Sequence, residues 1–104
     1  MRSLFYVPTR AEEETRRRIK LSIAAYHYEI LVGQDEEAAC NEVMTDHEFD
    51  SECLKVDLSI NTNRPDLDEW WRQYFNPHTG SWIGSHPEQF RLKELYYEHY
   101  HSKR

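Results

Sequence analysis

The sequence predicts an all-α fold, a compact single domain of about four helices with the first helix at its centre. Two observations lead to this prediction. Glycine is scarce, with three in 104 residues, and Gly33, Gly80 and Gly84 all fall where connections are expected. The glycine-free stretches between them carry apolar residues at intervals of three and four, the spacing of one helix face. A chain of 104 residues fits one small domain.

The first helix is expected over about residues 9–32, where Thr9 can act as the N-cap. Glutamates at 12–14 suit the positive end of the helix dipole. Two apolar stripes run along nearly opposite sides of this helix: Ile19, Ile23, Tyr26 and Ile30, and Leu21, Ala25, Tyr28 and Val32. A helix that is apolar on two sides is usually packed between others, so it should be the central one. Tyr26 and Tyr28 then point in different directions and cannot both line one pocket.

The second helix is expected to start with a capping box, in which Thr45 caps the helix and Glu48 reaches back to it. It should run over about residues 46–58, after an acidic connection in which residues 38–40 could add a helical turn. Asp46 and Asp50 add carboxylates on nearby turns. The apolar stripe of this helix consists of Phe49, Cys53, Val56 and Ile60. It predicts a core position for the cysteine.

Two further helices are expected in the C-terminal half. Pro65 suits the first position of a helix that extends to about residue 75. Residues 81–84 should form a short loop or an extended segment. Ser85 and Glu88 resemble a second capping box, which would open a last helix reaching about residue 101.

Composition limits the function classes. The formal net charge is −6, whereas general nucleic-acid binders are usually basic, so direct general binding of nucleic acid is not expected. The acidity serves either solubility or, more specifically, mimicry of DNA charge toward a basic partner. Cys40 and Cys53 are the only cysteines, and with no secretory signal they are expected to be reduced thiols. No apolar run is long enough to span a bilayer, so a soluble cytoplasmic protein is expected.

No pattern of catalytic or metal-binding residues stands out. The histidines and cysteines lack the spacing of a zinc site, and the alternating carboxylates at 46, 48, 50 and 52 lack the glycine of an EF-hand loop. No nucleophile motif and no glycine-rich phosphate loop occur. The sequence therefore predicts neither an enzyme nor a metal site.

The C-terminal half is rich in aromatic residues, which fits either core packing or a binding surface. Trp70 and Trp71 differ by about 100° in direction on a helix, so at most one of them should face the core fully. The candidates for contact with a partner are Trp70, Trp71, Trp82, Tyr96 and Tyr97.

Three motifs resemble one known domain. They are the pair Tyr26-His27, the run from Thr45 to Asp50 (TDHEFD), and the segment from Arg64 to Leu67 (RPDL). Together they resemble the N-terminal nicotinamide-nucleotide-binding (Ia) domain of NAD-dependent DNA ligases. The resemblance covers about residues 15–67, and about residues 68–104 would be an aromatic-rich helical extension.

The resemblance implies a set of ligand-binding residues and a possible ligand, NMN or NAD. The aromatic side chains would stack on the nicotinamide ring, while the carboxylates would accept hydrogen bonds from its amide and ribose. By resemblance these residues are Tyr26, His27, Asp46, Phe49 and Asp50. Phe49 stands where the family has tyrosine, and it could equally belong to the core. No Lys-x-Asp-Gly adenylation motif is present, so the resemblance implies a shared shape and not ligation.

Two classes of function are consistent with these features. The first is a non-catalytic small acidic interaction protein, similar to ligase-related reading frames of phages and mobile elements, which would act on a host or defence protein. The second is a stand-alone NMN- or NAD-binding module. A related alternative is an accessory that docks on a ligase or another nucleotidyltransferase. The small size, the acidity and the surplus aromatics favour the first, with no cofactor.

Overall fold

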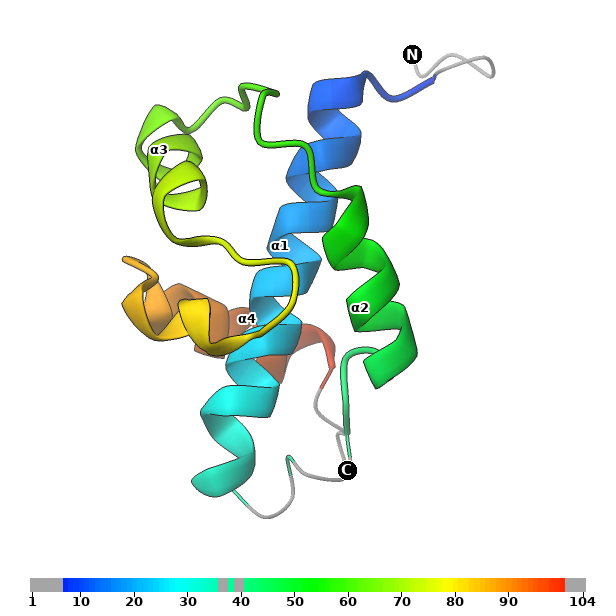
Figure 1. The fold of residues 1–104 in the computed structure, drawn as a ribbon. Coiled ribbons are helices and arrows are strands. Elements are labelled where there is room, and N and C mark those ends of the chain that lie inside the picture. The colour runs from blue at the N-terminus through cyan, green and yellow to red at the C-terminus, as the bar shows by residue number, and fades with distance from the viewer. Residues whose placement is uncertain (1–6, 36–37, 39–40, 101–104) are drawn as a thin grey trace, which may run out of the picture.

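The computed structural model describes residues 7–35, 38 and 41–100 (Figure 1). Within these ranges it contains helices and no strand, so the predicted all-α fold with about four main helices is confirmed. The main helices are α1 (Arg10–Glu29), α2 (Asp46–Lys55), α3 (Pro65–Tyr74) and α4 (Gln89–His99), and two 3-10 helices are η1 (Leu31–Gly33) and η3 (Ser81–Ser85). In the described part of the chain, no helix has the length and apolar character needed to cross a membrane.

Helix α1 is the centre of the fold, as predicted. It packs against α2, η3 and α4, and Figure 1 shows it running between α2 and α3. All seven residues from Leu21 to His27 are buried, so this part of the helix is covered on every side. The predicted stripes are wrong at their ends, because Ile19, Tyr28 and Val32 are exposed. The helix also stops at Glu29, before the predicted end.

The starts of α1 and α2 are set by local hydrogen bonds. Thr9 and Thr45 each form a complete capping box, with Glu12 and Glu48 respectively. Each box satisfies two backbone N–H groups that the first helical turn would leave without a partner. The sequence prediction of both starts is therefore confirmed.

Helix α2 is shorter than predicted but buries the predicted cysteine. Cys53 is 1% exposed, and desolvation raises the pKa of its thiol to about 11. The helix ends at Lys55 because Val56 adopts an extended conformation, so Val56 and Ile60 follow the helix instead of continuing its stripe. The helical turn predicted at residues 38–40 lies largely outside the described residues, as does Cys40.

The predicted capping box of α4 is wrong. The Ser85 hydroxyl donates to the Trp82 carbonyl within η3, and no side chain caps α4 itself. The backbone N–H of Glu88 instead donates to Nδ1 of His86 at 2.9 Å. Residues 81–85 form the 3-10 helix η3, where a loop or an extended segment was expected.

Both Trp70 and Trp71 are buried, at 7% and 2% exposed, so the prediction that at most one faces the core is wrong. The reason is that one side chain of η3 contacts both indoles. Trp82 of η3 packs against both indoles, with ring centroids 5.9 Å from Trp70 and 5.0 Å from Trp71. His86 covers Trp70 from the following turn, at 4.8 Å.

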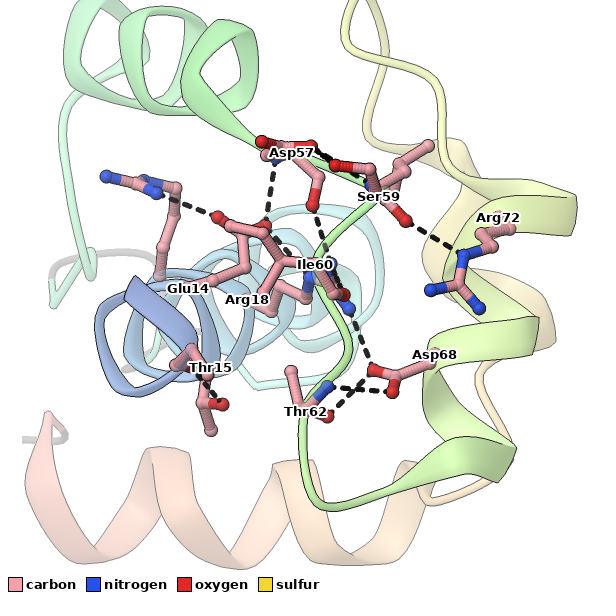
Figure 2. Close-up of polar contacts among 12 residues, drawn as sticks. Glu14, Thr15, Arg18, Asp57, Ser59, Ile60, Thr62, Asp68 and Arg72 are labelled. Carbon is pink, nitrogen blue, oxygen red and sulfur yellow. Dashed lines mark hydrogen bonds and ion pairs between the residues drawn. The ribbon is translucent and has the colours of Figure 1, made fainter. Parts of the chain in front are cut away.

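A buried guanidinium connects α1, α3 and the segment that follows α2 (Figure 2). Arg18 is 4% exposed, and its Nε donates to Glu14 at 2.9 Å while Nη1 donates to Asp68 at 3.0 Å. Its Nη2 donates to the carbonyls of Asp57 and Ile60, in the connection that follows α2. Arg18 therefore holds α1, α3 and this connection at one point.

The two carboxylates around Arg18 are also buried and accept further hydrogen bonds. Glu14, at 1% exposed, accepts from Arg17 and from the backbone N–H of Asp57. Asp68, at 3% exposed, accepts from both the hydroxyl and the backbone N–H of Thr62. Buried charges are tolerated only when they are paired and hydrogen-bonded in this way.

Truncation of Arg18 tests how much the fold depends on this cluster. Arg18→Ala leaves Glu14 and Asp68 as buried carboxylates without their main partner, so we expect a loss of about 3–5 kcal/mol in the free energy of unfolding. Urea denaturation measures the loss. Arg10→Ala is the matched control, because it removes an exposed ion pair to Asp57 and should cost less than about 1 kcal/mol. Equal losses in the two variants would contradict the prediction.

Candidate functional site

The sequence-predicted ligand residues lie around the end of α1 and the start of α2, where two adjoining hollows open. Their volumes are about 230 and 260 Å³, and Tyr28, Asp46 and Phe49 line both. Val32 lines the first hollow, and Asp50 lines the second together with Gly80. We call this surface the α1–α2 face and define it by Tyr28, Val32, Asp46, Phe49 and Asp50.

Tyr26 does not lie on this face. Its side chain is 6% exposed and packs in the hydrophobic core, and burial raises the pKa of its phenol. Of the five residues implied by the resemblance, Asp46, Phe49 and Asp50 come together, whereas Tyr26 is separated from them.

His27 has a position between the core and the face. It lines one edge of the 230 Å³ hollow but is only 5% exposed. Its Nε2 donates to the carbonyl of Ala38, and its ring stacks on Tyr96 with centroids 4.9 Å apart. The Tyr96 hydroxyl donates to the Asn41 carbonyl, so both rings attach the acidic connection to the helices. His27 is thus a structural residue with one edge near the hollow.

Tyr28 is the site residue that the sequence analysis did not select. Its side chain is 61% exposed and lines both hollows. The signal was present in the sequence, because residues two apart on a helix point about 200° apart. If Tyr26 is buried, Tyr28 must lie on the outer side. The resemblance favoured the first tyrosine, and the packing of α1 leaves the second one open.

Phe49 belongs both to the core and to the face. It is half-buried and packs against the hydrophobic core, yet it lines both hollows. A Cβ atom added to Gly80 would lie 3.7 Å from its ring, so the Gly80 backbone borders the ring directly. The two interpretations of Phe49 in the sequence therefore describe two sides of the same side chain.

The electrostatic character of the face is acidic. Among the residues that the structure describes, the two hollows are lined by four carboxylates and by no lysine or arginine. Asp46 and Asp50 lie one helical turn apart and are exposed. The remaining two are Glu29 and Glu42.

The aromatic residues predicted to contact a partner are mostly in the core. Trp70, Trp71, Trp82 and Tyr96 are all under 8% exposed. Tyr97 is half-buried, and its hydroxyl donates to Asp35, which raises the pKa of the phenol to about 12. Among the described residues, the large apolar side chains that reach the surface are Val7, Ile19, Tyr28, Val32, Leu54, Tyr74 and Phe90.

A second cleft, which the sequence analysis missed, opens between α1, α3 and α4. Its volume is about 280 Å³. It arises only when these three helices come together, so no local motif marks it. No three histidine, cysteine or acidic side chains gather as metal ligands anywhere in the described ranges.

The stability of the first turn of α2, which carries Asp46, should depend on pH. The hydrogen bond from the Thr45 backbone N–H, followed by that from its hydroxyl, lowers the pKa of Glu48. The ionised carboxylate therefore stabilises the folded state above the ordinary glutamate pKa, and this contribution is lost as the pH falls through the lowered pKa. Wild type should exceed Glu48→Gln in unfolding free energy at neutral pH, and the difference should disappear in acid. Urea titrations at several pH values measure this, and a difference that grows in acid would contradict it.

Comparisons with protein-family models, with curated proteins and with solved structures find no match to this chain. What the two sites do has to be inferred from their own residues.

Proposed function

We propose that the chain is a non-catalytic binding protein that uses the α1–α2 face to hold a basic segment of a protein partner. One observation carries the proposal: an aromatic ring that is 61% exposed, Tyr28, stands among four carboxylates with no lysine or arginine among the described lining residues. An open ring inside an acidic border is matched by a segment that carries arginine or lysine.

The composition of the face fits the usual anatomy of a protein interface. Aromatic side chains are the commonest binding hot spots, and they work best at the centre of a contact with polar residues around them. Tyr28 and the exposed side of Phe49 form such a centre. The surrounding carboxylates, in a molecule of net charge −6, attract a basic partner and speed its association.

The geometry also favours arginine over other basic groups. A guanidinium can stack on the face of a tyrosine ring and, at the same time, donate to carboxylates. Asp46 and Asp50 lie beside Tyr28 in the 260 Å³ hollow, so both kinds of contact are available there. The resemblance to small ligase-related phage proteins makes a host or defence protein the first class of partner to test.

A second candidate function uses the same face. Tyr28 could take the stacking role that the resemblance assigned to Tyr26, and Asp46 and Asp50 could accept from the amide and ribose of NMN or NAD. Two observations favour the basic protein partner over NMN or NAD as the ligand of this face. Each hollow is smaller than most small-molecule pockets, and four carboxylates with no lysine or arginine in the described lining repel a phosphate group.

Affinity capture with variants tests the partner proposal. We expect wild type to capture a basic protein in equal stoichiometry, and Tyr28→Ala or the double change Asp46→Asn with Asp50→Asn to reduce capture at least tenfold. Phe90→Ala, a change at a 74% exposed residue of α4 outside the face, should capture normally. Raising the salt from about 0.05 to about 0.5 M should weaken the complex. A partner that is retained by the face variants but lost from Phe90→Ala would overturn the proposal.

Calorimetric titration separates the two candidates. If the face takes a basic protein, NMN and NAD should give no saturable heat up to about 1 mM, because the carboxylates repel their phosphates. Nicotinamide riboside, which lacks the phosphate, is the matched ligand control for that repulsion. Saturable NMN binding that is weakened by Asp50→Ala and unchanged by Phe90→Ala would favour the second candidate instead.

A further inference from the structure

The cleft between α1, α3 and α4 has an apolar interior. Its apolar side chains come from three helices, so it is enclosed by elements that are far apart in the sequence. They are Ile19, Leu67, Trp71, Leu92 and Leu95. The volume of about 280 Å³ is close to the lower limit of small-molecule pockets. The cleft is independent of the α1–α2 face, which has no lining residue in common with it.

Two buried N–H groups belong to residues that line this cleft and have no acceptor among the described residues. The first is the indole Nε1–H of Trp71, and this residue is 2% exposed. The other two tryptophans behave differently, because Trp70 donates to the Ser85 carbonyl at 2.8 Å and Trp82 to the Thr79 carbonyl at 2.7 Å. A buried donor without a partner costs free energy, so such a group calls for an explanation.

The second donor is on His86, which is 6% exposed. Its Nδ1 accepts the backbone N–H of Glu88, and a nitrogen that accepts cannot carry the proton. The neutral ring therefore carries its proton on Nε2. Burial lowers the pKa of His86, which keeps the ring neutral at physiological pH. Nε2–H is then a fixed donor with no acceptor among the residues that the structure describes.

The charged groups of the cleft are already paired within the protein. Arg18 is bound by Asp68, and Arg64 by Glu88 at 2.8 Å. Arg91, the third cation of the lining, lies 3.7 Å from Glu94. An ionic ligand would have to give up its hydration and compete with these pairs, whereas a neutral ligand would not.

We propose that this cleft binds a small uncharged molecule with an apolar aromatic or aliphatic body and a carbonyl or similar hydrogen-bond acceptor. The apolar side chains enclose the body, and the acceptor receives the protons of Trp71 Nε1 and His86 Nε2. This site would be additional to the protein-binding face and does not depend on it.

Nuclear magnetic resonance on the full chain provides a direct test, with acetophenone as the probe. The three tryptophans give three indole N–H signals, and the signal absent from Trp71→Phe belongs to Trp71. We expect acetophenone to shift the Trp71 signal saturably and more than those of Trp70 and Trp82, whose N–H groups are already bonded. Ethylbenzene has nearly the same shape without an acceptor, and it should bind about two- to tenfold more weakly. Benzoate should bind more weakly as well.

A pair of leucine variants locates the binding. Leu95→Phe places a larger ring in the cleft and should abolish the saturable shift. Leu54→Phe makes the same change at a 68% exposed position of α2 and should leave it intact. The proposal is overturned if acetophenone gives no saturable shift at about millimolar concentration, if ethylbenzene binds equally well, or if Leu95→Phe binds normally.

Discussion

The buried guanidinium of Arg18 is the interaction on which the rest of the structure depends. Arg18 joins α1 to α3 through Asp68 and holds the connection after α2 through the carbonyls of Asp57 and Ile60. Removing such a charge from water is expensive, and only a nearly complete set of partners offsets the cost. The cluster therefore admits one arrangement of the three segments. That arrangement holds α3 and the connection after α2 against α1.

The aromatic residues divide into a buried group and a small open group, and this division separates the two candidate sites. Trp70 and Trp71 pack against Trp82 of η3, and Tyr96 with His27 attaches the acidic connection to the helices. Tyr28 remains outside, with carboxylates around it. The α1–α2 face is consequently open and acidic, whereas the cleft at α1, α3 and α4 is apolar with its charges paired. Their chemistries suit different ligands, so neither site needs the other.

Much of the fold could be predicted because its signals are local. The caps at Thr9 and Thr45 and the proline that opens α3 act within one helical turn, so neighbouring residues are enough to recognise them. The site was only partly predictable. Asp46, Phe49 and Asp50 are neighbours on one helix, but their aromatic companion is set by the packing of α1, which buries Tyr26 and exposes Tyr28. The capping box expected from Ser85 failed because η3 takes its hydroxyl.

The sequence alone determined the helical class, the central position of α1, the core position of Cys53 and the acidic character of the chain. These follow from periodicity, capping and composition, which are properties of adjacent residues. Only the tertiary structure decided which side chains meet: the partners of Arg18, the burial of both Trp70 and Trp71, the exposure of Tyr28, and the cleft with its two donors that find no acceptor among the described residues. The physical reason is that burial and charge pairing are properties of contacts between distant segments, and a local pattern does not specify which contacts form.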